Sequence, residues 1–429
     1  MKLPLAVRLA AFALVCLALF AGTPALAQAG IKASNASVES KFADHITYSI
    51  NLQSDADITS ATVFVRYHTG EPGATTTRGK ADITPSRNLS ALFTRKLTRG
   101  DLVPGTDIEY YWQIENAAGQ TLKTDPQMFS FPDDRFDFKS MSAPVGKGKA
   151  TVFWYGADQS YGQQRLNVCM AAIEKLQKQI GVELQQEAKI FIYRTRNDML
   201  AALPSKGQTA DAFLTVLGEL AGPNTVLLLG GDPNVDNTTY HELSHLVVHL
   251  ATTNPLIGGV NIPAWLDEGL SMYNQQTVES GYTNALNRAL QSDSLISVRS
   301  LTAVPGQPDQ VILFYGESYS LVKYLTETYS KEKMVQLLGV FKRGALVDDA
   351  LKEVYGFGVQ ELDNRWRASL GAAPRDASTP SGATQPNPPA QPNQPAQPNP
   401  APAAPFSCAC LSGALFLSLW WFIQRSSAT

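Results

Sequence analysis

Residues 238–250 read TTYHELSHLVVHL and carry three of the five histidines in this 429-residue chain. In a helix, side chains four residues apart stand about 40° apart on one face, roughly one turn along the axis. His241 and His245 can therefore reach a single metal ion, whereas Glu242, turned about 100° away, lies beside that ion. The spacing predicts a catalytic zinc helix with Glu242 as the base on a water molecule. The alternative is an ordinary amphipathic helix that carries imidazoles.

A catalytic zinc site needs a third protein ligand and leaves a fourth position for water. Residues 262–273, IPAWLDEGLSMY, predict a second helix beginning at Pro263 and supply two acids, Asp267 and Glu268. Helical periodicity does not choose between these acids, because neither lies on the apolar face of that helix. His249 is the competing ligand. It lies two turns from the first histidine and about 80° round the helix, too far to join the other two.

The pair of motifs HELSH and WLDEG resembles the gluzincin metallopeptidases, most closely the peptidase MA-like family related to aminopeptidase N. In that family the third ligand is the glutamate that precedes a glycine, and here 22 residues separate His245 from Glu268. The resemblance implies one Zn²⁺ ion held by His241, His245 and Glu268. It extends over the later helical segments and covers about residues 136–371.

The same resemblance implies a side chain that stabilises the oxyanion, and a strand that binds substrate. Tyr315 and Tyr319 share a helical face, the family pattern favours Tyr315, and for either residue a core role is the alternative. The strand TVLLL, residues 225–229, resembles the edge strand along which gluzincins bind extended peptide. The motif Gly-x-Met-Glu-Asn, with which aminopeptidase relatives hold a substrate N-terminus, is absent. We therefore expect an endopeptidase rather than an aminopeptidase.

Composition and periodicity divide the chain into a multidomain arrangement. Residues 1–27 have a basic start, an apolar run and a small-residue ending, which predicts a secretory signal peptide. Residues 28–135 alternate in the manner of half-buried strands and predict an all-β sandwich, similar to fibronectin type III domains, as an accessory domain. Residues 136–371 mix strands with helical patterns and predict an α+β zincin-like metallopeptidase domain.

The C-terminal part predicts a tether. Residues 372–405 repeat Pro, Gln and Asn and cannot bury enough apolar surface to fold, so we expect a disordered, stiff linker. Residues 406–423 form an uncharged apolar run that predicts a transmembrane helix, or a sorting segment that is processed, before a short cytoplasmic tail at 424–429. The chain is thus expected to be secreted across the membrane and anchored at the cell surface, with its catalytic domain extracellular.

Charge and cysteine content exclude several function classes. The formal net charge of −3 and the lack of a basic stripe argue against nucleic acid as a partner. Cys169 is the single cysteine of the central region, so no disulfide framework is expected there, and its helical apolar neighbours favour a packed thiol over a nucleophile. The sequence does not indicate an oligomeric state.

The favoured function is a surface-tethered zinc metallopeptidase that acts on peptide or protein substrates. Glu242 would take a proton from water and pass it to the leaving amine, while Tyr315 steadies the oxyanion. The alternative from another class is a catalytically silent cell-surface binding protein that uses the sandwich and the zincin fold as a scaffold. Hydrolysis of a non-peptide amide or ester would use the same chemistry and is not separable by sequence.

Overall fold

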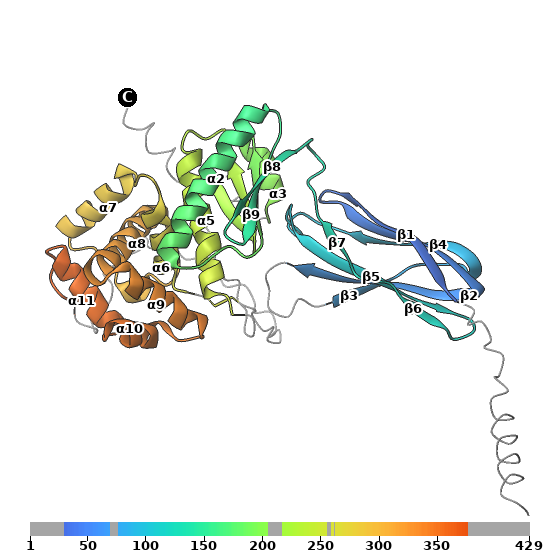
Figure 1. Cartoon of the computed structure of the whole chain (residues 1–429). Helices are drawn as coiled ribbons and strands as arrows, with labels where there is room; N and C mark the ends of the chain where they lie inside the picture. The colour runs from blue at the N-terminus through green and yellow to red at the C-terminus, as the bar shows by residue number, and fades with distance from the viewer. Residues whose placement is uncertain (1–29, 69–75, 205–216, 255–258, 261, 376–429) are drawn as a thin grey trace, which may run out of the picture. The chain divides into compact units, whose positions relative to one another are not determined.

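The computed structural model describes residues 30–68, 76–204, 217–254, 259–260 and 262–375 (Figure 1). Two compact units divide the chain: Met1–Tyr67, Thr75–Leu97 and Ile108–Phe129 form the first, and His68–Ala74, Thr98–Asp107 and Ser130–Thr429 form the second. The expected signal peptide, the 406–423 segment, the tail and almost all of the linker lie outside the described residues. Within the described part of the chain, no helix is long and apolar enough to cross a membrane.

The first unit is all-β. Its strands are β1 (Lys32–Lys41), β2 (His45–His68), β3 (Thr76–Lys80), β4 (Ser86–Lys96), β5 (Asp107–Asn116), β6 (Thr121–Lys123) and β7 (Gln127–Ser130). Strand order is β1-β2-β5-β6, with β3 and β4 also paired to β2 and β7 paired to β5. The rings of Tyr48 in β2 and Tyr110 in β5 lie 5.4 Å apart, and both side chains are buried. The inward-facing residues of β2 and β5 therefore share a buried core. The all-β character of this unit agrees with the expectation, and its described strands pair into one seven-stranded sheet.

One strand of this unit is longer than the sequence indicates. The alternating apolar segments ITYSINL, residues 46–52, and VFVRY, residues 63–67, are two halves of the 24-residue strand β2. The first half pairs with β1 and β4, and the second half pairs with β3. The polar stretch between the halves stays extended because its groups find partners: Ser54 Oγ accepts a hydrogen bond from Asn116 Nδ2 at 2.9 Å.

The second unit holds a five-stranded sheet and the helices that follow it. The strands are β8 (Lys139–Val145), β9 (Gly148–Trp154), β10 (Glu187–Tyr193), β11 (Gly218–Gly222) and β12 (Thr225–Leu229), in the order β11-β12-β10-β9-β8. The three inner strands are parallel, and the two outer strands run antiparallel to them. The strand TVLLL is β12, which lies inside the sheet, so the expectation of an edge strand there is wrong. The edge is β11.

The helices of the second unit are α2 (Gln159–Ile180), α3 (Arg196–Ala202), α5 (Val235–Thr252), α6 (Ala264–Asn274), α7 (Ser280–Gln291), α8 (Pro308–Tyr329), α9 (Lys331–Lys342), α10 (Val347–Tyr355) and α11 (Val359–Ser369), with a 3-10 turn η1 (Val298–Ser300). Helices α2 and α5 lie against the sheet (Figure 1). The remaining helices from α6 onward follow them in the chain and build an α-helical part. This arrangement agrees with the expected α+β class.

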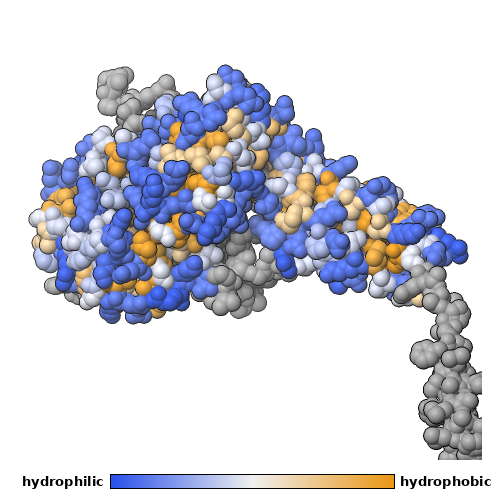
Figure 2. Space-filling model, in the orientation of Figure 1, coloured by the Kyte–Doolittle hydropathy of each residue, from blue (hydrophilic) through white to orange (hydrophobic). Residues whose placement is uncertain are grey.

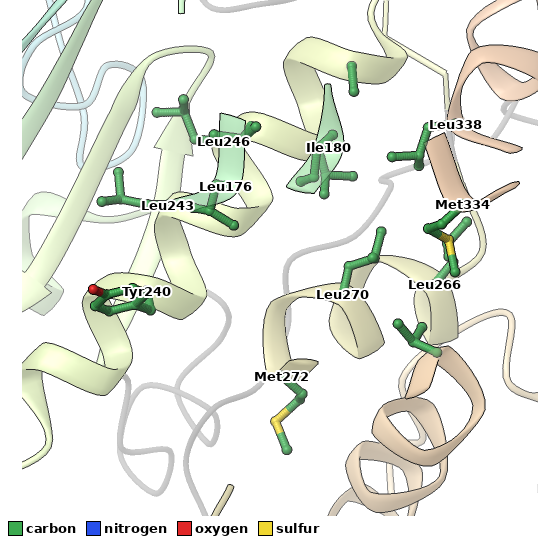
Figure 3. Packing of buried hydrophobic residues seen from close by; sticks show 14 of the residues in the cluster. Leu176, Ile180, Tyr240, Leu243, Leu246, Leu266, Leu270, Met272, Met334 and Leu338 are labelled. Atoms are coloured by element: carbon green, nitrogen blue, oxygen red, sulfur yellow. The ribbon is translucent and has the colours of Figure 1, made fainter. Parts of the chain in front are cut away.

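A single apolar core joins the sheet to these helices. Trp154 of β9 and Ile190 of β10 share a buried cluster with Leu243 of α5, and Cys169 of α2 is a fully packed thiol in it. Figure 3 shows part of this cluster: Leu176 and Ile180 of α2 and Leu246 of α5 belong to the same buried set as Leu270 of α6 and Met334 and Leu338 of α9. Each fully buried aliphatic side chain contributes about 1.5–3 kcal/mol, so this packing fixes α5 and α6 relative to the sheet. Hydrophilic residues cover most of the face in Figure 2, and the second unit shows only small apolar patches there.

Candidate metal centre

Helix α5 carries the HELSH motif into the core. Arg165 of α2, itself buried, forms an ion pair with Asp236 in the first turn of α5. The helix dipole of α5 stabilises the negative charge of Asp236 at this position. Leu243 and Val247 of α5 are at most 1% exposed and belong to the buried apolar cluster. His241, at 1% exposure, is therefore held in place by neighbours on nearly all sides.

Helix α6 brings the acids to these histidines because it packs unusually close to α8. A Cβ added at Gly269 would lie 2.4 Å from the carbonyl oxygen of Ser318 and 2.6 Å from a methyl group of Val322. Only glycine permits this approach. The residue that precedes it, Glu268, is thereby placed beside α5.

Three ligand-type atoms converge between α5 and α6. His241 Nε2 and His245 Nε2 lie 3.2 Å apart, and Glu268 Oε2 lies 3.2 Å from the first and 3.5 Å from the second. Among the described residues, these three side chains form the group of His, Cys, Asp and Glu that can hold a metal ion. The structure thus brings together the three residues that the resemblance implies as ligands.

These distances suit a zinc ion. Bonds of about 2.0–2.2 Å in a tetrahedral arrangement place ligand atoms roughly 3.3–3.6 Å apart, close to the three spacings observed. Glu268 Oε2 is also buried without a well-formed hydrogen bond, although it is near both imidazoles. A buried carboxylate oxygen in that state needs a cation, and the two histidines beside it complete a donor set that zinc prefers.

Asp267 has a different place from its neighbour Glu268. Its Oδ1 lies 3.0 Å from His245 Nδ1, the ring nitrogen that faces away from the ligand group. The two successive acids therefore contact opposite nitrogens of one imidazole, which helical periodicity alone did not separate. A carboxylate behind a histidine fixes its tautomer and orientation.

Opposite charges dominate the electrostatics of this group. Burial lowers the pKa of His245, but the carboxylates of Asp267 and Glu268 outweigh burial and hold that pKa well above its usual value. Burial raises the pKa of Glu268, but His245 and His241 lower it to about 2. Both shifts have the same cause, which is the pairing of carboxylate with imidazole in a dry site.

Glu242 lies under the edge strand β11. Its side chain is 3% exposed, and a Cβ added at Gly218 would fall 2.6 Å from Glu242 Cγ and 3.0 Å from Glu242 Oε1. The same Cβ would fall 2.8 Å from Thr238 Cγ2. Gly218 therefore lets the strand pass directly over the carboxylate. The role of Gly218 could not be predicted from the sequence, because pairing between distant segments gives no local signal.

Tyr315 and Tyr319 differ in their surroundings. Tyr315 is 2% exposed; burial raises its pKa well above the usual value, and the nearby carboxylate of Glu268 raises it further. Its ring lies 5.9 Å from that of Tyr282, whereas the ring of Tyr319 lies 6.4 Å from Tyr273. Of these two tyrosines, Tyr315 is thus the one whose pKa is raised by the carboxylate of the ligand Glu268.

His249 is not part of the group. Burial lowers its pKa, and its ring packs on Gly259, where an added Cβ would lie 3.1 Å from His249 Cε1. The His-His-Glu group contains His241 and His245 but not this third histidine. Its separation from the ligand group follows from the straight helix, as the sequence predicts.

Comparisons with known proteins agree with this geometry. Residues 168–372 match the model of the Peptidase MA superfamily, a span that contains the His-His-Glu group. No curated protein sequence matches the chain significantly.

Solved structures give weak overall similarity. An M1 zinc metallopeptidase from Deinococcus radiodurans is 11% identical, with 76% of this chain and 89% of that chain covered and a TM-score of 0.40. A mutant of a two-domain M1 zinc metallopeptidase, bound to L-tryptophan, is 11% identical over 80% of this chain and 93% of that chain, with a TM-score of 0.37. A bromine derivative of BhCBM56 is 15% identical over 22% of this chain and 88% of its own, with a TM-score of 0.17. The family match, together with the His-His-Glu group inside it, identifies residues 168–372 as a gluzincin-like domain of the Peptidase MA superfamily.

Proposed function

We propose that this chain is a zinc-dependent endopeptidase. The observation that carries the proposal is the spacing of 3.2 to 3.5 Å among His241 Nε2, His245 Nε2 and Glu268 Oε2, inside a peptidase-superfamily domain. Glu242, the second residue of HELSH, is buried next to this group under the sheet edge.

His241, His245 and Glu268 would hold the ion. When bound there, zinc supplies a Lewis acid that lowers the pKa of a water molecule and polarises a carbonyl oxygen. Glu242 accepts the proton of the attacking water on its carboxylate and returns it to the leaving amine. The Tyr315 hydroxyl stays protonated because burial and Glu268 raise its pKa, so it remains a hydrogen-bond donor for the oxyanion of the substrate.

Strand β11 is the surface that we assign to the substrate backbone. It is the last strand of the described sheet on the side of α5, and Gly218 in it touches Glu242. An extended peptide that pairs with the outer side of β11 would place a carbonyl group near that carboxylate. The strand reads GELAG and lacks the Gly-x-Met-Glu-Asn motif, which supports internal cleavage over removal of N-terminal residues.

For the location of the enzyme, we propose export and anchoring at the cell surface. The support is sequence pattern alone: the leader-like residues 1–27, the Pro-rich residues 372–405 and the apolar residues 406–423. Detection of the full-length chain in the membrane fraction, with the peptidase domain accessible to added protease on intact cells, would support this part of the proposal. A full-length chain found only in the soluble fraction would contradict it.

The deciding experiment compares the purified chain with its Glu242→Gln variant. We expect one zinc per chain in both, cleavage of a broad peptide library by the wild type, and a loss of at least about 100-fold in the variant. Glu183→Gln, at an exposed glutamate paired to Lys147, is the matched control and should cleave like the wild type. Peptides with free and with acetylated N-termini then distinguish an endopeptidase from an aminopeptidase. An endopeptidase cleaves both kinds of peptide, whereas an aminopeptidase needs the free N-terminus.

Two outcomes would overturn the proposal. A Glu242→Gln protein that still cleaves peptides would remove the assigned base. A wild-type protein that binds zinc and cleaves no peptide in the library would favour a silent binding protein.

A further inference from the structure

Gln275 contacts the side of His241 that faces away from the ligand group. His241 Nε2 faces His245 and Glu268, whereas its Nδ1 lies 2.9 Å from Gln275 Nε2. Gln275 is the C-cap residue of α6 and is half-buried. Both nitrogens of the His241 ring are therefore occupied, so the orientation of the ring depends on this amide.

Asn237 holds Gln275 in position. It lies one turn before His241 in α5, and its Oδ1 accepts the backbone N–H groups of Gln276 at 2.9 Å and Thr277 at 3.2 Å. Its Nδ2 donates to the carbonyl of Thr277 at 2.9 Å and lies 3.4 Å from Gln275 Oε1. The turn after α6 is thus fastened to α5 beside the histidine, which leaves the Gln275 amide little freedom to move away.

The end of α6 is fixed from the other side as well. Asn274 Nδ2 donates to Ser244 Oγ at 3.1 Å, and both side chains are buried. The carbonyl of Asn274 accepts from Lys175 Nζ of α2 at 2.8 Å. The residue before Gln275 is therefore anchored to two helices, so the position of the amide is built into the fold.

The two histidines have partners of different chemistry. His245 Nδ1 faces the carboxylate of Asp267 at 3.0 Å, which only accepts when ionised, whereas the Gln275 amide both donates and accepts. A histidine that binds a metal through Nε2 carries its proton on Nδ1 and needs an acceptor there. A half-turn of the amide plane gives up the long, 3.4 Å contact of Gln275 Oε1 with Asn237 Nδ2, and it presents oxygen in place of nitrogen to His241 Nδ1.

From this geometry we infer that Gln275 is a positioning residue for His241 and that it serves both tautomers of the ring. Its amide nitrogen donates to Nδ1 when the Nε2 atom carries the proton, and its amide oxygen accepts from Nδ1 when Nε2 binds the ion. The inference rests on the zinc site of the proposed function. His241 thus has a neutral partner, Gln275, at its Nδ1 atom, whereas His245 has an anionic partner, Asp267, at the same position.

The test measures zinc affinity, not hydrolysis, on the full chain by competition with a chromophoric chelator. Gln275→Met keeps the length of the side chain and removes the hydrogen bond, so we expect the zinc Kd to rise about 10- to 100-fold. Gln275→Glu keeps an acceptor and should bind zinc at least as tightly as the wild type. Gln276→Met, at the exposed neighbouring residue, is the control and should leave the Kd unchanged.

The absorption spectrum of the Co²⁺-loaded proteins adds a readout of ligand geometry. It should change in Gln275→Met and match the wild type in Gln275→Glu and Gln276→Met. The inference fails if Gln275→Met binds zinc like the wild type, or if Gln275→Glu is weakened as much as Gln275→Met. A wild-type chain that binds no zinc overturns the proposed function and this inference together, whereas a zinc-binding wild type with an unaffected Gln275→Met overturns this inference alone.

Discussion

Gly218 of strand β11 lies against Glu242 of helix α5 so closely that a Cβ at position 218 would fall 2.6 Å from Glu242 Cγ. The site is therefore assembled from a sheet edge and a helix that touch without a side chain between them. Anything added at Gly218 must displace the assigned base.

Gly218→Ala should separate metal binding from catalysis. We expect normal zinc content, because the ligands are on α5 and α6, and a fall of about 100-fold in kcat/KM from a displaced carboxylate. Gly222→Ala is the matched control in the same strand, because the nearest atom to an added Cβ there is 3.7 Å away. Equal activity of the Gly218→Ala enzyme and the control would show that the strand does not position Glu242.

Tyr315→Phe should lower kcat by about 100- to 1000-fold with little change in KM, because it removes a donor to the oxyanion. Tyr319→Phe, one turn further along α8 and near Tyr273, should leave kcat close to the wild-type value. Steady-state kinetics on one peptide substrate compares the two, and the thermal unfolding midpoint checks that both variants are folded. A similar loss of kcat in both variants would mean that Tyr315 is an aromatic core residue and not the oxyanion donor.

Asp267 and Glu268 should differ in their effect on zinc. Glu268→Ala removes a ligand and should abolish tight binding, whereas Asp267→Ala removes the partner of His245 Nδ1 and should weaken the Kd about 10- to 100-fold. Asp349→Ala is the control: Asp349 is also an acid in the first turn of a helix, but it is exposed on α10. Titration against a competing chelator measures all three, and an Asp267→Ala Kd equal to that of the control would contradict the role of Asp267.

Glu317 should make stability depend on pH. It is fully buried, its Oε1 accepts the backbone N–H of Ile296 at 2.9 Å, and burial raises its pKa to about 8. The pKa of Glu317 is higher in the folded protein than in the unfolded chain. Its contribution to the free energy of unfolding is therefore fully present below about pH 4.5 and is lost as pH rises toward 8, at roughly 1.4 kcal/mol per pH unit.

Urea unfolding of the wild type and Glu317→Gln at pH 5, 7 and 9 measures this contribution. Glutamine has nearly the shape of protonated Glu317 but does not ionise. The free energy of unfolding of the wild type should therefore fall relative to that of the variant as pH rises. Parallel pH profiles for the two proteins would mean that Glu317 does not carry a raised pKa.

The local parts of the site were predictable from the sequence, because helix geometry sets them. The spacing of His241, Glu242 and His245 follows from about 3.6 residues per turn, and the structure places all three as that spacing requires. The choice between Asp267 and Glu268 was not predictable from periodicity, since it depends on how α6 crosses α5. The family resemblance supplied Glu268, and the geometry then assigned Asp267 its own place behind His245.

The sheet edge could not be predicted in the same way. Strand β11 reads GELAG, which has no β-branched or aromatic residue, so its pairing with β12 leaves almost no local pattern. The segment TVLLL did hold a signal against an edge position: its residues are apolar almost throughout and are buried on both faces, as inner parallel strands are. Gln275 was missed for a related reason, because its contact with His241 joins two helix ends that only the tertiary fold brings together.

The close approach at Gly269 has a mechanical consequence. Glu268 is the residue before that glycine, and Tyr315 lies one turn before Ser318, the residue whose carbonyl Gly269 touches. Helices α6 and α8 are therefore in direct backbone contact near the site, which restricts changes in the separation of the third ligand and the assigned oxyanion donor. Because Asn274 and Gln275 also fasten the end of α6 to α5, we expect motion that changes access to the histidines to occur between these helices and β11. Crosslinks that lock α6 to α8 should therefore be harmless, whereas crosslinks from β11 to α5 should trap the enzyme in one state.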